Sequence, residues 1–164
     1  MTRIILHADV NSAFLSWESV KGLSENKDAE DLRLIPSAVG GDVKTRTGII
    51  LAKSVPAIKY GIVTGEPIVK ALKKCPQLVL CKSDFRTYNK YSSEFIRILK
   101  EYAPVVEQFS IDEAFMDMTG TELIYPDIVK TANEIRCRIK EELGFTINVG
   151  ISENKLLAKM ASDF

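Results

Sequence analysis

The order of apolar and polar positions along this chain predicts buried strands and amphipathic helices. Residues 3–9 form an extended segment that is apolar on both faces and ends in the carboxylate Asp9, as is typical of a fully buried strand. Further along, two stripes of apolar residues recur at intervals of three and four, and each predicts a long amphipathic helix. The first stripe consists of Tyr88, Tyr91, Phe95, Ile98, Leu99 and Tyr102, and the second of Ile124, Ile128, Ala132, Ile135, Ile139 and Leu143.

Shorter elements fill the chain between the first strand and the first long helix. Asn11 or Ser12 is a suitable N-cap for a helix that runs to about Lys21. Pro56 and Gly61 are typical of the first turn and the end of another short helix. The remaining elements are predicted as an irregular segment at 22–36, strands at 38–40, 49–52 and 78–80, and a helix from Glu66 to about Lys74.

The second half of the chain alternates strands with helices. Two strands joined by a short turn precede the second long helix, and a further strand and helix follow it. With two helices on one face of a mixed sheet, this order predicts an α+β fold of the ferredoxin-like, split βαβ type with a small inserted subdomain. The predicted elements are strands at 105–109, 114–118 and 145–151, a turn at 110–113, and a helix that begins at Asn154 and still continues at Phe164.

Composition narrows the range of functions. The 164 residues include 22 basic and 22 acidic side chains, so the formal net charge is zero. A self-sufficient nucleic-acid binder is usually basic, so neutrality counts against a chain that holds DNA tightly by itself. It does not count against a catalytic core with an acidic site. No apolar run approaches the ~20 residues that span a membrane, and we expect a cytoplasmic protein. Cys75, Cys81 and Cys137 lack zinc-site spacing and are expected to be buried or half-buried thiols.

Three carboxylates are the candidate catalytic residues. Asp9 ends the first strand, and Asp112 and Glu113 lie in the turn of the predicted hairpin. If that hairpin pairs beside the first strand, the three converge at one end of the sheet. Mg²⁺ prefers such oxygen ligands, and two ions ~3.5–4 Å apart would suit in-line phosphoryl transfer. Neighbouring residues on a flat strand point to opposite faces, so the turn must twist. The alternative is that Asp9 caps a helix and the other two are solvated turn residues.

Three segments resemble signatures of one family. They are Ile5 to Phe14 (ILHADVNSAF), Ser110 to Ala114 (SIDEA) and Val149 to Lys159 (VGISENKLLAK). In order and spacing they are similar to the palm motifs of the Y-family DNA polymerases, the DinB/UmuC-like or ImpB/MucB/SamB group. The resemblance implies a palm at 1–12 and 84–164, fingers at 13–83, and thumb and little-finger domains that this chain does not contain.

The resemblance also implies roles for individual residues. Asp9, Asp112 and Glu113 would hold two Mg²⁺ ions, for which Mn²⁺ can substitute, with help from the carbonyl of Val10. Phe14 lies where the family keeps an aromatic steric gate against the ribose 2′-hydroxyl, although its place on a helix stripe equally predicts a core aromatic. We read the single histidine, His7, as structural. Four lysines are weaker candidates for nucleotide or phosphate contacts: Lys53, Lys59, Lys155 and Lys159.

By the same resemblance, the chain is expected to belong to a template-directed DNA polymerase that extends a primer 3′ end with dNTP, in translesion synthesis and DNA repair. Primer-template DNA would be its partner, and a sliding clamp would be reached through a C-terminal region outside this chain. The fragment alone is expected to be nearly inactive. Val55 and Ile58 depart from the pattern, because the family usually has Tyr and Arg there to hold the triphosphate.

Two alternatives stay open at this point. Val55 and Ile58 motivate a degenerate, non-catalytic polymerase relative that binds DNA or a partner. A nucleotide cyclase shares the palm and the two-metal logic, and Gly40-Gly41-Asp42 echoes the diguanylate cyclase motif. That motif belongs on the palm hairpin, however, whereas this echo lies in the inserted segment and continues as Val43-Lys44.

Overall fold

The computed structural model describes residues 2–41 and 48–164. The chain separates into two compact units, one made of Met1–Asn11 and Asn89–Phe164 and the other of Ser12–Tyr88. The second unit contains the segment 13–83 that the sequence predicts as an insertion, together with Ser12 and residues 84–88. None of the helices in the described residues combines the length and the apolar character that crossing a bilayer requires.

The first unit is built on a four-stranded sheet. The strands are β1 (Ile5–Val10), β5 (Val105–Gln108), β6 (Glu113–Asp117) and β7 (Ile147–Ser152), in the order β5-β6-β1-β7. Every neighbouring pair is antiparallel. The α+β split βαβ fold is therefore confirmed, but the expectation of a mixed sheet is wrong for this unit. Each crossover helix returns the chain to a strand that is not a direct neighbour of the one it left, so the parallel strands never pair.

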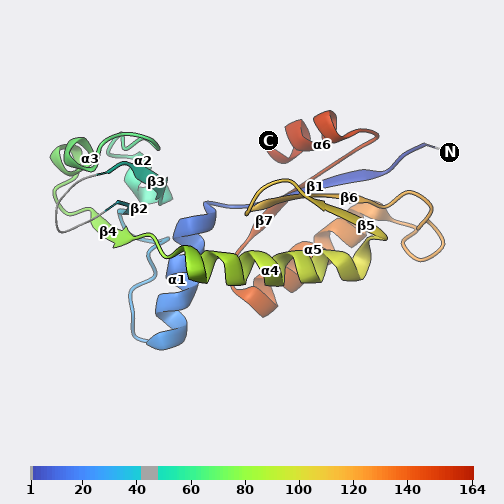
Figure 1. Cartoon of the computed structure of the whole chain (residues 1–164), viewed down its shortest axis with the longest axis horizontal. Helices are drawn as coiled ribbons and strands as arrows, with labels where there is room; N and C mark the ends of the chain where they lie inside the picture. The colour runs from blue at the N-terminus through green and yellow to red at the C-terminus, as the bar shows by residue number, and fades with distance from the viewer. Residues whose placement is uncertain (1, 42–47) are drawn as a thin grey trace. The chain divides into compact units, whose positions relative to one another are not determined.

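Helices cover both faces of this sheet. Figure 1 shows α4 (Phe85–Tyr102) and α5 (Ile128–Leu143) on one side and α6 (Lys155–Ser162) on the other. Since successive residues of a strand point to opposite faces, the largely apolar β1 is buried by both layers. On the α6 side, Ile5, Phe115 and Ala158 form a buried cluster.

Two helix boundaries in this unit differ from the predictions. Ile124 does not belong to α5. Its side chain is 73% exposed, and it lies in a turn in which its N–H donates to the Thr121 carbonyl. Pro126 disfavours helical backbone in the residue before it, and the Asp127 carboxylate then caps α5 by accepting from the N–H of Lys130. The prediction that the last helix continues through Phe164 is also wrong, because α6 ends at Ser162.

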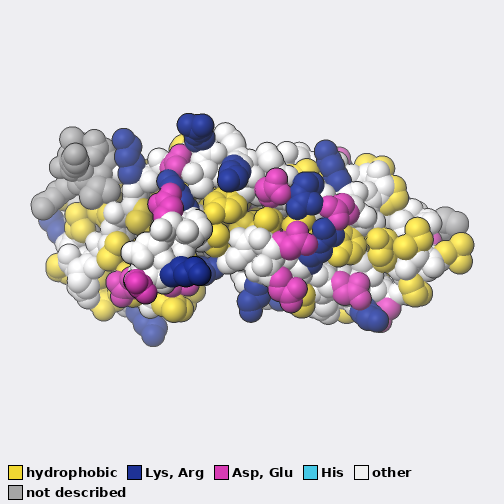
Figure 2. Space-filling view, turned by 90° about the horizontal axis from the view of Figure 1, so that it is seen from below, with side chains coloured by type: hydrophobic (Ala, Val, Ile, Leu, Met, Phe, Trp, Pro, Cys, Tyr) yellow, Lys and Arg dark blue, Asp and Glu magenta, His cyan; other side chains and the backbone are white. Residues whose placement is uncertain are grey.

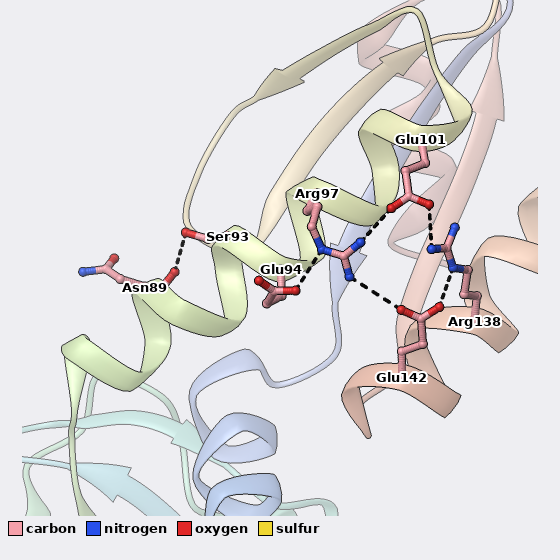
Figure 3. A network of polar contacts seen from close by, with 7 residues as sticks. All are labelled: Asn89, Ser93, Glu94, Arg97, Glu101, Arg138 and Glu142. Carbon is pink, nitrogen blue, oxygen red and sulfur yellow. Dashed lines mark hydrogen bonds and ion pairs between the residues drawn. The ribbon is translucent and has the colours of Figure 1, made fainter.

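Charged residues of both signs are interspersed over the outer face of α4 and α5 (Figure 2). Five of them form one network across the two helices, drawn in Figure 3. Arg97 contacts Glu94 and Glu101 on its own helix and Glu142 on α5, and Arg138 closes the network through Glu101 and Glu142. Two positive and three negative charges meet in this network, so most of its charge is compensated within it.

The second unit holds a three-stranded sheet in the order β3 (Ile50–Lys53), β2 (Ser37–Gly40), β4 (Val79–Lys82). Strand β2 pairs antiparallel with β3 and parallel with β4. Buried apolar residues from the strands and short helices form its core, in a cluster made of Ala38, Ile50, Ala57, Ile62, Ile68, Ala71, Cys75 and Leu78. The helices of this unit are α1 (Ala13–Glu25), α2 (Val55–Ile58) and α3 (Ile68–Lys74).

The short elements of this unit were mostly predictable from their caps. The Ser54 side chain accepts from the N–H of Ala57 at the start of α2, and Gly61 has the left-handed φ of 71° expected after its end. Helix α1 extends beyond the predicted end at Lys21, because Gly22 is tolerated inside it. Cys75 is buried and Cys81 partly so, but Cys137 is exposed, contrary to expectation.

Candidate functional site

Asp9 and Glu113 lie opposite each other at one end of the sheet. The antiparallel register pairs Asp9 on β1 with Glu113 on β6, so the two side chains share a face. The pairing continues into the turn, where the Val10 N–H donates to the Asp112 carbonyl at 3.0 Å. The hairpin therefore lies beside the first strand as the sequence argument requires, and it brings Asp112 next to Val10.

The turn before Glu113 is tied by hydrogen bonds. The N–H groups of Phe109 and Ser110 both donate to the Glu113 carbonyl, at 3.0 and 3.2 Å. The Ser110 hydroxyl donates to the Asp112 carboxylate at 2.6 Å. Asp112 lies just outside β6, which begins at Glu113. The Asp112 side chain is thus held by its own turn.

Like charges concentrate at Asp9. Burial first, and then the charges of Glu113 and Asp112, raise the pKa of Asp9 to about 7. A carboxylate in this position is costly to ionise unless a positive charge is nearby. All three groups offer oxygen donors, which are the ligands that hard divalent cations prefer. The donor chemistry therefore fits a divalent cation.

The carboxylates are neighbours, but Glu113 and Asp112 each bind another side chain. Within residues 2–41 and 48–164, no three His, Cys, Asp or Glu side chains are gathered closely enough to hold one metal ion. The Lys159 ammonium donates to Glu113 Oε2 at 2.6 Å, and Ser110 holds Asp112. Burial would raise the pKa of Glu113, but the hydrogen bond and charge of Lys159 outweigh it and leave that pKa below its usual value.

His7 on β1 is fully buried, and its ring lies next to the Glu113 carboxylate. Its Nδ1 lies 2.7 Å from the Ser162 hydroxyl, and its Nε2 lies 3.5 Å from Glu113 Oε2. The ring also packs against Phe115, with centroids 4.7 Å apart. Burial and the charge of Lys159 lower the pKa of His7. These contacts suit a structural role. Ser162 was not singled out in the sequence, since nothing local marks a contact across 155 positions.

Phe14 belongs to the second unit. It stacks on Tyr88, with centroids 4.8 Å apart and planes 21° apart, and its ring also contacts Trp17 and Phe85. The side chain is partly exposed. The predicted core packing of this aromatic ring is therefore present, and one part of the ring remains accessible.

The four candidate lysines occupy different settings. Lys53 on β3 donates to the Thr64 hydroxyl at 3.1 Å, and Lys59 is exposed just after α2. Lys155 forms an ion pair with Glu107, while Lys159 binds Glu113. Both lysines of α6 are thus paired with carboxylates of the sheet.

The two departures from the family pattern lie on α2. Val55 is 69% exposed and Ile58 is 53% exposed, so neither is required by the core of the second unit. Of the suggested cyclase motif, Gly40 ends β2, but the residues from Asp42 to Lys44 lie outside the described residues. The palm hairpin carries Ser-Ile-Asp-Glu in place of that motif.

Comparison with known proteins places the chain in a family. The sequence profile of the impB/mucB/samB family matches residues 8–163. The chain therefore belongs to the impB/mucB/samB family, and the resemblance inferred from its motifs is confirmed.

Relatives and solved structures agree with this assignment. The chain is 53% identical over 163 residues to DNA polymerase IV of Clostridium acetobutylicum, covering 99% of this chain and 41% of the relative. It is 42% identical to DNA polymerase IV of Acetivibrio thermocellus, covering 99% and 39%. The fold matches a Y-family DNA polymerase chimera of Dbh and Dpo4 with a TM-score of 0.87, at 26% identity, covering 98% of this chain and 45% of that one.

A second structure gives the same result. DinB from Sulfolobus solfataricus matches with a TM-score of 0.83 at 27% identity, again over 98% of this chain and 45% of that one. The palm-and-fingers fold of the Y-family polymerases is therefore the fold of this chain. The chain spans about two fifths of the length of the curated relatives it matches.

Proposed function

We propose that this chain supplies the palm and fingers of a DNA-directed DNA polymerase that adds dNTP to a primer 3′ end, in translesion synthesis. The family match and the relatives named DNA polymerase IV support the class of reaction. The observation that carries the proposal is the pairing of Asp9 with Glu113, next to Asp112, at one end of the palm sheet.

In this proposal the carboxylates of Asp9, Asp112 and Glu113, with the Val10 carbonyl, hold two Mg²⁺ ions, or Mn²⁺ in their place. Bound divalent ions would stabilise the attacking and leaving oxygens of an in-line nucleotidyl transfer. The protein's own contribution is positioning: the pairing of β1 with β6 fixes the backbone of Asp9 and Glu113, and the turn before β6 holds Asp112. The buried ring of His7, with Nε2 3.5 Å from Glu113 Oε2, would help to fix the position of that carboxylate.

We assign the two units to two polymerase subdomains. The palm is assigned to 1–12 and 84–164 and the fingers to 13–83, close to the division into compact units. Phe14 is assigned as the steric gate from its position in the family motif, and its contacts with Tyr88, Trp17 and Phe85 would keep the ring rigid in that role. Lys53, Lys59, Lys155 and Lys159 are assigned to nucleotide or phosphate contacts.

Primer-template DNA and dNTP are the proposed partners, and a sliding clamp would bind elsewhere in a longer protein. The relatives are about two and a half times the matched length, and the net charge of this chain is zero. A neutral chain has few cations to spare for phosphates. We therefore propose that the chain alone is nearly inactive, and that activity belongs to the whole protein.

A degenerate, non-catalytic DNA-binding or partner-binding module is the second candidate. The exposed apolar residues Val55 and Ile58 favour it, since they lack the phenol and guanidinium that would hold a triphosphate. Three adjacent carboxylates count against it, because a scaffold without metals has no use for charges that raise the pKa of Asp9 to about 7.

Metal-dependent nucleotide binding separates the two candidates. Calorimetry would measure dNTP binding to the protein with Mn²⁺ and without it, beside an Asp9→Asn variant and an Asp117→Asn control. Asp117 also lies on β6, but it pairs with Arg3 at the other end of the strand. The polymerase reading predicts metal-dependent binding that Asp9→Asn weakens and Asp117→Asn leaves unchanged. If dNTP binds equally well without Mn²⁺ and in the Asp9→Asn variant, the non-catalytic binding module is favoured.

A further inference from the structure

A recess lies in the corner where α5 turns back to the edge of the sheet. Helix α5 ends at Leu143, Gly144 reverses the chain with a left-handed φ of 78°, and β7 begins at Ile147. The recess has a volume of about 260 Å³, close to the lower limit of ~300 Å³ for small-molecule pockets. It is lined by Asn133, Arg136, Cys137, Lys140, Thr146 and Ile147.

This recess is separate from the three carboxylates. Asp9 pairs with Glu113 on one side and with Asn148 of β7 on the other, so these three side chains share one face of the sheet. Ile147 precedes Asn148 and therefore points to the opposite face, the side on which Figure 1 shows α5. The sheet thus stands between the recess and the proposed metal site.

The charged side chains that line the recess are both positive. Arg136 and Lys140 are four positions apart on α5, so they lie on the same side of the helix. Among the described residues, neither forms an ion pair. In contrast, Arg138 on the same helix binds Glu101 and Glu142. The carboxylates of α5 do not line the recess; they are Glu134, Glu141 and Glu142.

The guanidinium of Arg136 is held in place. Its Nε donates to the Ile147 carbonyl at 3.3 Å, and its Nη1 donates to Asn133 Oδ1 at 3.1 Å. The remaining N–H groups of the fork stay available to a ligand, and little side-chain entropy is lost when it binds. The Thr146 hydroxyl accepts from the Asn11 amide at 3.0 Å, so its own hydrogen can be donated to the same ligand.

We propose that this recess binds a phosphate group carried by a small molecule. A planar guanidinium matches two phosphate oxygens with paired hydrogen bonds, and the Lys140 ammonium adds a second positive charge. The volume of about 260 Å³ suits a small ligand. A long nucleic-acid strand is a poorer fit, because strand binding needs many cations and the net charge of this chain is zero. The site is additional to the proposed polymerase reaction and uses none of its carboxylates.

Cys137 is a natural reporter of the charge in the recess, because it lines the recess and is exposed. Cys81, which is partly buried, is an internal control in the second unit. The recess beside Cys81 is lined by several acidic residues: Glu18, Glu25 and Glu30. Mass spectrometry would measure the alkylation rate of each thiol by anionic iodoacetate and by neutral iodoacetamide. The ratio of the two rates cancels the thiol's own reactivity and reports the local charge.

We expect the ratio of iodoacetate to iodoacetamide rates to be higher at Cys137 than at Cys81. Lys140→Gln should lower the ratio at Cys137 about two- to fivefold, the range of one partly exposed charge interaction. Lys130→Gln is the matched control, since Lys130 is an exposed lysine at the other end of α5, and it should leave the ratio unchanged. A ratio at Cys137 that is no higher than at Cys81, or that Lys140→Gln does not lower, would overturn the proposal.

Protection of Cys137 from iodoacetamide then tests binding itself. Inorganic phosphate or pyrophosphate, in metal-free buffer, should slow alkylation of Cys137 and leave Cys81 unaffected, whereas sodium chloride at equal ionic strength should not protect. Lys140→Gln and Arg136→Gln should each weaken the protection, and circular dichroism checks that both variants are folded. The proposal is wrong if neither anion protects Cys137, if chloride protects equally well, or if only a single-stranded oligonucleotide protects it. None of these results would bear on the metal site, because metal is absent from the assay.

Discussion

Replacing Gly150 with alanine should damage the fold more than its single added carbon suggests. The new Cβ would lie 2.0 Å from the Ala158 carbonyl oxygen, 2.5 Å from the Ser162 nitrogen and 3.0 Å from the Ala161 carbonyl carbon. All three are backbone atoms of α6, so no side-chain rotation relieves the clash. Reaching an ordinary contact of about 3.4 Å requires the helix to move by roughly 1.4 Å.

The free-energy cost combines two contributions. Overpacking of this kind costs about 1–3 kcal/mol. A shift of α6 also strains the hydrogen bonds that Ser162 makes with His7 and Asn148, each worth about 0.5–1.5 kcal/mol. We therefore expect Gly150→Ala to lower the free energy of unfolding by about 2–6 kcal/mol.

Urea denaturation followed by circular dichroism measures this cost. Gly22→Ala is the matched control, because Gly22 lies inside α1 with no atom within 4 Å of the added carbon. That change should raise stability by about 0.4–1 kcal/mol. If Gly150→Ala stays within about 0.5 kcal/mol of wild type, α6 does not pack on β7 at this distance.

Two further predictions concern stability. Arg97→Ala should cost less than about 1 kcal/mol in urea denaturation, and less still at 1 M salt, because the network of Figure 3 is largely exposed; a loss above about 2 kcal/mol would refute this. The hydrogen bonds and charge of Arg33 and a hydrogen bond from Ser19 hold the pKa of Asp31 well below its usual range. The resulting stability is therefore fully present above the unfolded pKa of about 4 and is lost as pH falls below it. In Asp31→Asn, the free energy of unfolding measured by urea denaturation should therefore fall less steeply between about pH 4 and lower pH than in the wild type. The same pH dependence in both proteins would contradict the lowered pKa of Asp31.

The sequence identified the central strands and their carboxylates because strong local signals mark them. The apolar run before Asp9 and the short Ser-Ile-Asp-Glu turn predicted β1 and the hairpin, and the antiparallel register then places Asp9 opposite Glu113. Motif spacing supported the same site through the family resemblance. These features depend on residues near one another in the chain or on a pattern that the family shares.

Other features depend on contacts between distant segments. The bond between His7 and Ser162, and the backbone contact at Gly150, have no local signal. The pairing of Lys159 with Glu113 likewise joins residues 46 positions apart. Periodicity also overextended the α5 stripe to Ile124, where a proline turn prevails over the apolar repeat. Helical spacing alone could not show whether a lysine faces a phosphate or a carboxylate.

The central claim is that Asp9, Asp112 and Glu113 form the metal site of a DNA polymerase. Single-nucleotide primer extension with Mg²⁺ by the whole protein that contains this chain tests it most directly. Asp112→Ala is the decisive variant, and Asp117→Asn is the control. The account predicts extension by the wild type and the control that is lost in Asp112→Ala. Extension by Asp112→Ala at the wild-type rate, or no extension by any protein even with Mn²⁺ and high dNTP, would contradict it.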